Sequence, residues 1–328
     1  GKHFQEFKDI DYLPEKLGKR VLTTGGHFGY LKIAEGCDKH CTYCIIPKLR
    51  GKFRSVPMER LIAQAEDMAE QGVKELILVA QETTVYGKDL YGKKSLHILL
   101  KKLCEIKGIR WIRVLYCYPE EIYDELIETI RDEKKICHYL DIPIQHASDR
   151  ILKRMGRRTS KQELIDIVGK LRKEIPDIVL RTTLITGFPG ETEEDHEELK
   201  EFVDEMEFDR LGVFTYSPEE NTPAAEMADQ VPEEVKEERR DELMELQQEI
   251  SYDKGQDRIG QELLVMIEGK VADESAYIGR TYGDAPKVDG YIFVQTGELL
   301  MTGDFAKVRV TGALEYDLIG VLSDEYTE

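Results

Sequence analysis

The sequence predicts an α/β fold in two parts, an incomplete (β/α)6 TIM-like barrel followed by a small antiparallel β-barrel. First, six short apolar runs rich in β-branched residues alternate with helical patterns between residues 30 and 217. Second, this alternation implies parallel strands joined by right-handed crossovers, and about 190 residues is too short for eight such units. Third, the pattern changes after Ile259 to strand-like runs that Gly and Asp interrupt.

Each expected element follows from the spacing of its apolar residues. The six expected parallel strands are 30–36, 75–81, 111–119, 139–145, 177–187 and 210–217. Apolar residues at three and four spacing predict helices over 56–72, 95–108, 120–133, 160–176 and 192–207. Ser160 and Glu163 form a capping-box pattern, and Thr192 is the expected N-cap of the last helix.

The chain is expected to divide at changes of pattern. Residues 1–28 form a lead-in, 29–232 the first domain, 233–258 a charged connecting helix and 259–328 the β-barrel domain. The expected barrel strands are 262–269, 276–282, 290–297, 305–314 and 316–323.

Charge indicates the kind of partner. The net charge of -19 argues against a surface that grips a phosphate backbone, so nucleic acid is not expected as the main partner. Residues 259–328 hold 13 acids against 5 Lys and Arg, which favours a basic partner. No apolar run approaches the roughly 20 residues of a membrane span and no signal peptide is recognisable, so a cytoplasmic location without membrane attachment is expected.

Three of the six cysteines are clustered. Cys37, Cys41 and Cys44 fall within eight residues, whereas Cys104, Cys117 and Cys137 are scattered through apolar segments as ordinary buried thiols would be. Three thiolates can hold three irons of a [4Fe-4S] cluster and leave the fourth iron open. The alternative is zinc, with His40 as the fourth ligand in Cys-x2-His-Cys-x2-Cys, although this spacing is cramped for a tetrahedral site.

Other unusual segments follow later strands at the edge where the cysteines lie. They are 81–84, 145–148, 187–191 and 216–217. The loops at the carboxyl ends of barrel strands build the active site, so we expect one cavity to collect all of these segments.

The motifs resemble a known family. Cys-x3-Cys-x2-Cys, with Tyr43 before its last cysteine, is the hallmark of the radical SAM superfamily. LVAQETTVYG, DIPIQHASDRILKRMGR, RTTLITGFPGETEEDHEEL and the terminal small barrel of TRAM type resemble the methylthiotransferases over nearly the whole chain. IPIQHAS and GRTYGDAPKVDGYIFV resemble the RimO-like branch, which modifies an aspartate of ribosomal small-subunit protein twelve. The alternative is the MiaB-like branch, which modifies adenosine in tRNA.

The resemblance implies a radical SAM barrel whose residues bind S-adenosylmethionine beside the cluster at the three cysteines. It implies that Tyr43 contacts the adenine side and that Gln81, Glu82 and Thr83 contact the methionine end. Gln145, Arg181 and the segment Phe214, Tyr216 and Ser217 are candidates for the ribose, carboxylate and adenine, and no catalytic residue is expected beyond the cluster and the cofactor.

Three of these assignments have open alternatives. Phe214 and Tyr216 at alternate strand positions are equally consistent with core packing. Arg181, placed at a strand end, is also consistent with pairing to a surface acid. The basic residues beyond the cysteines, Lys48, Arg50 and Arg54, either guide a substrate carboxylate or form a solvated loop.

The resemblance also implies an activity. A 5'-deoxyadenosyl radical takes hydrogen from the β-carbon of the aspartate, and a methylthio group is added there. An electron donor such as a flavodoxin-type reductant supplies electrons to the cluster. The family has a second [4Fe-4S] cluster in an N-terminal domain, so we interpret this chain as a truncated form and expect that cluster only in the full-length protein. A hypothesis of another class is a docking module for the ribosomal protein without full activity.

Overall fold

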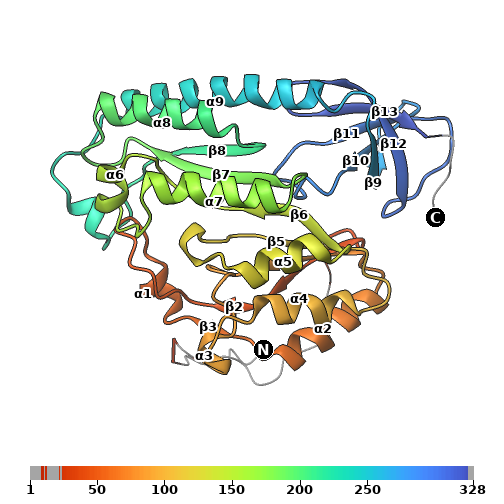
Figure 1. Ribbon diagram of the computed structural model, residues 1–328, viewed down its shortest axis with the longest axis horizontal. Coiled ribbons are helices and arrows are strands. Elements are labelled where there is room, and N and C mark those ends of the chain that lie inside the picture. Colours follow the sequence, from red (N-terminus) through yellow and green to blue (C-terminus); the bar gives the residue numbers. More distant parts are fainter. Residues whose placement is uncertain (1–8, 11, 13–21, 23, 324–328) are drawn as a thin grey trace, which may run out of the picture.

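A computed structural model describes residues 9, 10, 12, 22 and 24–323, and its centre is one open parallel sheet (Figure 1). Its strands are hydrogen-bonded in the order β1-β4-β5-β6-β7-β8, and neighbouring strands are parallel throughout. The sheet does not close between its first and last strands, so the prediction of an incomplete six-unit barrel is confirmed. The strands are β1 (Phe28–Lys32), β4 (Glu75–Val79), β5 (Trp111–Val114), β6 (Ile136–Asp141), β7 (Val179–Thr186) and β8 (Arg210–Thr215).

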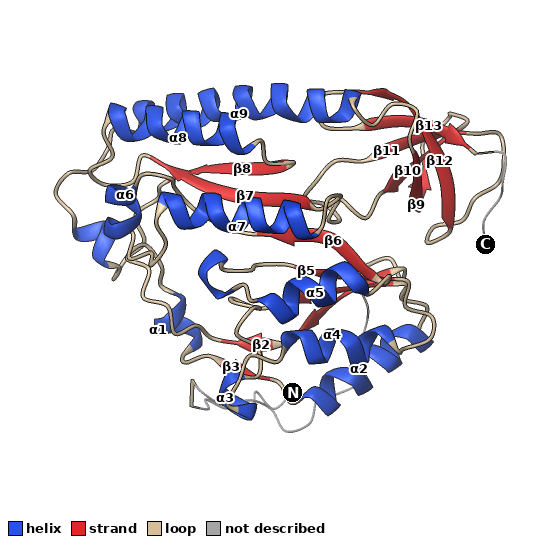
Figure 2. Ribbon diagram, viewed as in Figure 1, coloured by secondary structure: helices blue, strands red, loops and turns tan. Residues whose placement is uncertain are grey.

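Amphipathic helices pack against the sheet (Figure 2). They are α2 (Met58–Glu70), α4 (Leu96–Cys104), α5 (Asp124–Asp132), α7 (Lys161–Glu174) and α8 (Glu193–Met206). Both expected N-caps are confirmed, because Ser160 and Thr192 each accept a bond from a backbone N–H three residues later within a complete capping box.

Several predicted elements were wrong in extent. The strand expected over 111–119 ends at Val114, and the strand expected over 139–145 runs from Ile136 to Asp141. Two further differences change the backbone at the edge of the sheet. The strand expected over 30–36 is interrupted after Lys32, and Ala34–Glu35 (β2) turns to pair with Arg54–Ser55 (β3). The helix expected over 120–133 starts only at Asp124, because Pro119–Glu121 form a 3-10 turn (η1) and Tyr123 is extended. Both changes place irregular backbone at the carboxyl edge of the sheet.

Four short helical elements lie at the carboxyl edge of the sheet. They are α1 (Ile46–Arg50), α3 (Lys88–Tyr91), α6 (Asp149–Arg154) and η2 (Pro223–Glu226). Each follows a strand of the sheet or the β2 loop, so the connections that build a site lie at one end of the sheet.

A long helix leads to the second barrel. Helix α9 (Glu233–Gln256) packs along α8 and β8 and reaches β12 (Figure 1). The closed barrel has the order β10-β11-β13-β12-β9, with strands β9 (Glu262–Lys270), β10 (Ala276–Arg280), β11 (Ile292–Gln295), β12 (Phe305–Ala313) and β13 (Leu318–Leu322).

The barrel is antiparallel with one exception. Strands β11 and β13 are parallel, because the chain leaves β11 to pair β12 with β9 and then returns as β13, which runs in the direction of β11.

The boundaries expected for the domains stay a prediction.

A buried ion network joins the two parts. Glu75 of β4 is fully buried and accepts hydrogen bonds from Arg113 (2.8 Å) and from Arg280 of the second barrel (2.7 Å). The segment after β10 also inserts Asp284 against Arg210 and Asp289 against Tyr139. Because these charges are removed from water, their pairing ties the amino ends of the sheet strands to the barrel.

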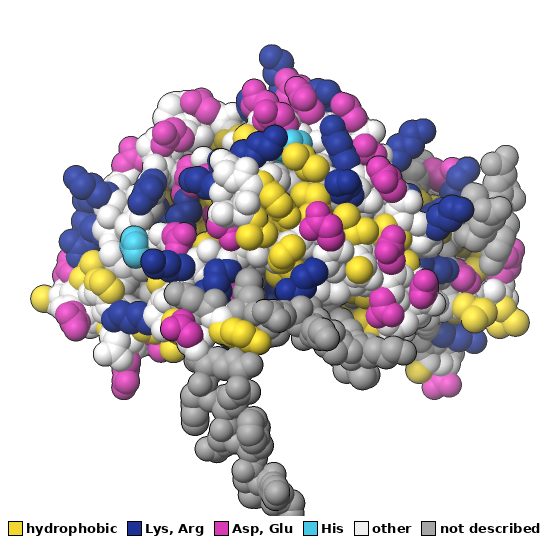
Figure 3. Space-filling view, turned by 90° about the horizontal axis from the view of Figure 1, so that it is seen from below, with side chains coloured by type: hydrophobic (Ala, Val, Ile, Leu, Met, Phe, Trp, Pro, Cys, Tyr) yellow, Lys and Arg dark blue, Asp and Glu magenta, His cyan; other side chains and the backbone are white. Residues whose placement is uncertain are grey.

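Charged side chains cover the surface unevenly. On the face drawn in Figure 3, acidic and basic side chains surround apolar ones, and Lys and Arg gather toward the left edge. None of the helices in the described part of the chain is long and apolar enough to cross a bilayer.

Candidate functional site

The three clustered cysteines lie on the loop between β2 and α1. Cys37 and Cys41 are buried and Cys44 is half-buried. The Cys37 amide donates to the Gly51 carbonyl (3.2 Å), which ties the start of the loop to the chain beyond α1. Burial raises the pKa of the Cys37 thiol to about 11 and also raises the pKa of Cys44, so iron binding at neutral pH would release protons.

The donor set on this loop fits an iron-sulfur cluster in its chemistry. Within residues 24–323 and the few described before them, no three His, Cys, Asp or Glu side chains are grouped as they would be around a metal ion. The three thiols are therefore not gathered around one point in the described part of the chain. Thiolate is the ligand that iron-sulfur clusters use, and these three thiols belong to one short loop at the carboxyl edge of the sheet.

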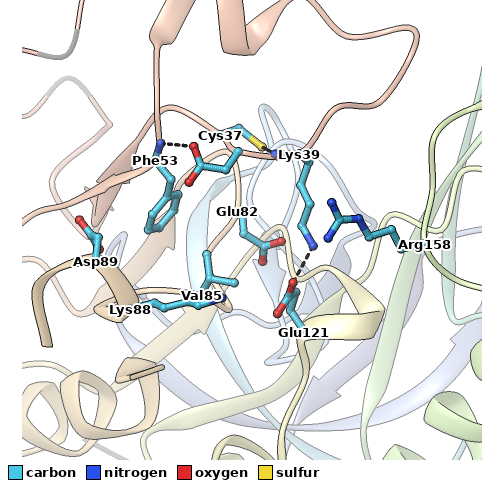
Figure 4. Close-up of a pocket in the computed structure, with 10 residues that line it drawn as sticks. Cys37, Lys39, Phe53, Glu82, Val85, Lys88, Asp89, Glu121 and Arg158 are labelled. Atoms are coloured by element: carbon cyan, nitrogen blue, oxygen red, sulfur yellow. Dashed lines mark hydrogen bonds and ion pairs between the residues drawn. The ribbon is translucent and has the colours of Figure 1, made fainter. Parts of the chain in front are cut away.

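A cavity of about 400 Å³ opens beside Cys37 (Figure 4). Glu82 lines it from the end of β4, where it is almost fully buried. One of its oxygens accepts from the Thr84 amide (3.1 Å), while Oε2 has no partner among the described residues. Burial raises the pKa of Glu82 to about 7. A buried carboxylate oxygen without a partner is costly, and a cationic group in the cavity would satisfy it.

The other two residues of this segment have structural contacts. Gln81 accepts from the Gly36 amide through Oε1 (2.9 Å) and so holds the start of the cysteine loop. Thr83 is fully buried, and its hydroxyl donates to the backbone carbonyls of Leu115 and Tyr116. Neither side chain lines the cavity beside Cys37, whereas Glu82 does. Neither of them lines a second cavity, which lies at the ends of β5 to β8.

A second cavity of about 400 Å³ lies at the ends of β5 to β8. It collects six of the nine residues expected to bind the cofactor: Tyr43, Gln145, Arg181, Phe214, Tyr216 and Ser217. Aromatic rings and one guanidinium dominate its lining, which suits a ligand with a flat ring and polar edges. Sequence reasoning correctly grouped these residues, but the expectation that one cavity collects all of the loop segments was wrong, because Glu82 lines the separate cavity beside Cys37.

Phe214 and Tyr216 differ in exposure. Phe214 is 60% exposed, so core packing does not explain it. Tyr216 is 3% exposed and packs edge-on against Phe188 (5.3 Å between ring centroids), as a core residue would. Its hydroxyl nevertheless has no partner among the described residues, although it lines the cavity.

The position expected for Arg181 was wrong. It is the third residue of β7, deep below the edge, and its guanidinium pairs with Asp141 (3.0 Å) and with Asp289 of the second barrel (3.3 Å). Both carboxylates are buried, so they are not the surface acid of the alternative interpretation. With two acids already paired to it, Arg181 is a poor receptor for a third carboxylate.

Two strained residues line the same cavity. Tyr116 (φ 63°) and Gln145 (φ 73°) have positive φ angles at the ends of adjacent strands. Asp141 accepts from the Tyr116 amide (3.2 Å), and Gln145 exchanges backbone hydrogen bonds with Thr183 and Ile185. Such strain persists only where the surroundings hold it, and it concentrates at binding sites.

Sequence reasoning missed Arg157. This residue is 7% exposed, its guanidinium lies 4.3 Å from the centre of the Tyr118 ring, and the Tyr118 hydroxyl is 3.8 Å from Cys41 Sγ. One terminal nitrogen donates to Pro143, while Nε has no partner among the described residues. Arg157 belongs to the run GRR, which is typical of a solvated turn. Its burial near the cysteine loop could therefore not be predicted from the sequence.

The remaining loops of the edge are anchored to α9. His146 accepts from the Ala147 and Ser148 amides through Nδ1, which leaves Nε2 protonated and 3.5 Å from Glu191. Glu191 in turn pairs with Arg239 of α9 (2.9 Å). The segment 187–191 is therefore a turn held by contacts to α9, and its Phe188 packs edge-on against the ring of Tyr43 (6.4 Å between ring centroids).

Comparisons with known proteins agree with this geometry. The family Radical SAM superfamily matches residues 31–203, and the TRAM domain matches residues 259–322. A ribosomal protein uS12 methylthiotransferase RimO from Lachnoclostridium phytofermentans is 66% identical over 320 residues, which are 98% of this chain and 73% of that relative. The chain belongs to the RimO family of radical SAM methylthiotransferases.

Other RimO proteins and two solved structures extend the comparison. A RimO protein of Clostridium perfringens strain 13 is 56% identical over 94% of this chain and 68% of its own length. Coproporphyrinogen III oxidase (HemN) from Escherichia coli, a radical SAM enzyme, has a TM-score of 0.52 at 16% identity and covers 86% of this chain and 66% of its own. The methyltransferase TsrM from Kitasatospora setae has a TM-score of 0.51 at 15% identity over 60% of this chain and 38% of its own. The last two show a shared fold alone.

Proposed function

We propose that this RimO-family chain modifies ribosomal protein uS12 by adding a methylthio group to the β-carbon of an aspartate. The observation that carries the proposal is the cysteine loop at the carboxyl edge of the sheet, next to two cavities, in a chain 66% identical to a uS12 methylthiotransferase. The acidic second barrel supports a basic protein as substrate rather than tRNA.

In this proposal Cys37, Cys41 and Cys44 would hold one [4Fe-4S] cluster. When bound, it would supply the electron for cleavage of S-adenosylmethionine to a 5'-deoxyadenosyl radical. A second cluster at the scattered cysteines is not part of the proposal, because Cys117 and Cys137 are each enclosed in apolar core.

The protein's own residues bind and orient the cofactor. Glu82 receives its ammonium group through the unpartnered Oε2, and Arg157 receives its carboxylate through the unpartnered Nε. Tyr43, Phe214 and Tyr216 enclose the adenine. Arg157 takes the carboxylate role first expected of Arg181, whose guanidinium is already paired with two buried acids.

The test follows hydrogen abstraction directly. The protein is reconstituted with iron and sulfide, reduced with dithionite and incubated with S-adenosylmethionine and uS12 whose aspartates carry β-deuterium. We expect deuterium in 5'-deoxyadenosine from the parent and from Cys117→Ala, and none from Cys41→Ala. Deuterium transfer that survives in Cys41→Ala, or that requires tRNA and not uS12, would contradict the proposal.

A further inference from the structure

Each of the three clustered cysteines has a hydrogen-bond partner at its sulfur, and the partner of Cys41 differs in kind. The backbone amide two residues further along the chain donates to Cys37 Sγ (3.4 Å), and the equivalent amide donates to Cys44. Cys41 Sγ instead lies 3.8 Å from the hydroxyl oxygen of Tyr118, on the segment that follows β5. A side chain from a distant part of the sequence makes this contact, so a substitution can remove it without changing the backbone of the cysteine loop.

The surroundings of Tyr118 fix its position. Its side chain is 6% exposed, and its amide donates to Thr84 Oγ1 (3.2 Å). Two cations lie over its ring, Lys39 at 5.0 Å and Arg157 at 4.3 Å from the ring centre. Because a cation is attracted to the face of an aromatic ring, these two side chains restrain the plane of the ring. The hydroxyl is thereby kept beside Cys41.

Both cations are anchored in turn. Lys39 pairs with Glu120 (3.1 Å) and with Glu121 (2.6 Å), and Figure 4 shows the contact with Glu121. Arg157 is buried and donates to the carbonyl of Pro143 (2.9 Å). Neither cation is a solvated side chain that only happens to pass the ring, so the arrangement around the ring is part of the fold.

The cysteine loop is tied to the same segment that restrains the ring. Thr42, the residue after Cys41, donates through its amide and its hydroxyl to two backbone carbonyls of the segment 154–157 (2.9 and 2.8 Å). The last residue of this segment is Arg157, whose guanidinium lies over the ring of Tyr118. One short segment therefore holds both partners of the contact between hydroxyl and sulfur.

The direction of this hydrogen bond follows from the chemistry of an iron ligand. In the free thiol either atom can donate. A cysteine that binds iron has lost its proton, so its sulfur can only accept. A phenol keeps its proton at neutral pH, so Tyr118 is the donor when Cys41 is a ligand. Hydrogen bonds with an ionised partner are roughly twice as strong as neutral ones.

We propose that Tyr118 is a positioning residue that donates a hydrogen bond to Cys41 and thereby raises the reduction potential of the cluster held there. The inference rests on the part of the proposed function that places a [4Fe-4S] cluster at the three cysteines. Hydrogen bonds to the sulfurs are among the factors that set the potential of such clusters. The reduced cluster carries one more negative charge, so a donor at its sulfur stabilises it more than the oxidised cluster. No proton moves with the electron, because the phenol keeps its proton in both states.

The test compares two substitutions of tyrosine by phenylalanine in the same stretch of chain. Tyr118→Phe removes the hydroxyl and keeps the ring. Tyr123→Phe is the control, because its hydroxyl contacts His97 of α4 (3.0 Å) rather than the cysteine loop. Each protein is reconstituted with iron and sulfide, and its iron content is measured. Electron paramagnetic resonance then follows the reduced cluster in a potentiometric titration without S-adenosylmethionine.

We expect the equilibrium constant for one-electron reduction to be about tenfold smaller in Tyr118→Phe than in the parent. This change corresponds to a potential about 59 mV more negative. The constant of the control should lie within about twofold of the parent. Pulsed electron-nuclear double resonance of the reduced cluster in D2O gives a spectroscopic signature of the same contact. One coupling to an exchangeable deuteron should be present in the parent and in Tyr123→Phe and absent from Tyr118→Phe.

A second variant should move the potential in the opposite direction. 3-Fluorotyrosine at position 118 keeps the hydroxyl and makes it more acidic, so it is a stronger donor. We expect its potential to be less negative than that of the parent. A role in packing alone would not shift the two variants in opposite directions, and this variant retains the ring and the hydroxyl if Tyr118→Phe does not fold.

Failure of this inference is distinguishable from failure of the proposed function. Equal potentials in the parent and Tyr118→Phe, or a 3-fluorotyrosine protein with a more negative potential than the parent, would overturn the inference and leave the proposed function standing. A shift of equal size in Tyr123→Phe would overturn it as well, since loss of any buried hydroxyl would then explain the change. If the parent itself binds no iron-sulfur cluster, the proposed function fails and the inference fails with it.

Discussion

The buried carboxyl of Glu82 makes the stability of the fold depend on pH in an unusual direction. Burial raises its pKa from an ordinary 4.5 to about 7. Below pH 4.5 the carboxyl is protonated in the folded and unfolded states and contributes nothing. Between pH 4.5 and 7 the folded protein keeps a proton that the unfolded chain has released, so the free energy of unfolding decreases as the pH rises. Above pH 7 the buried carboxylate lowers the free energy of unfolding by its full cost, about 3 kcal/mol.

Glu82→Gln removes this dependence because glutamine does not titrate. The free energy of unfolding in urea is measured for the cluster-free parent and variant at pH 4.5 and at pH 8. From pH 4.5 to pH 8 we expect the free energy of unfolding of the variant to rise by about 3 kcal/mol relative to that of the parent. Glu121→Gln is the control from the same cavity, since hydrogen bonds from Lys39 and Lys94 outweigh burial and lower its pKa. Its stabilisation is gained as the pH rises to 4.5 and is complete above that, so Glu121→Gln should keep a nearly constant difference from the parent between pH 4.5 and 8. A parent and Glu82→Gln that keep a constant difference across this range would refute the reasoning.

Three further predictions concern buried charge, a cap and the cofactor. Glu75→Gln leaves Arg113 and Arg280 buried with less compensation, so urea unfolding should show a loss of about 3 kcal/mol or more; a loss below about 1 kcal/mol would contradict the role of the network. Ser160→Ala removes the side chain that accepts the Glu163 amide and should cost about 1 kcal/mol by the same measurement, with no change in cofactor binding. Arg157→Gln should weaken S-adenosylmethionine binding to the reconstituted protein by about 10- to 100-fold in calorimetry, and an unchanged affinity would remove Arg157 from the site.

Local chemistry could be inferred from chain order. Cys37, Cys41 and Cys44 are neighbours in sequence, so their common loop needs no tertiary information. The six strands and the two capped helices also follow from local patterns, because apolar spacing and N-cap residues act within a few positions. Parallel strands end at one edge, which is why Gln145, Phe214 and Ser217 could be grouped before the structure.

Contacts between distant segments could not be inferred in this way. Arg181 was placed at the edge of the sheet, yet Asp289 of the second barrel and Asp141 of β6 hold it below that edge. Arg157 belongs to a run that is typical of a solvated turn, and only packing over Tyr118 buries it. Burial and pairing of a side chain depend on which surfaces meet in the folded protein. The tertiary structure alone therefore decided that Glu82 and Arg157 each keep one buried polar atom without a partner near the cysteine loop. It also decided that two basic segments, residues 45–56 and 150–161, flank this loop.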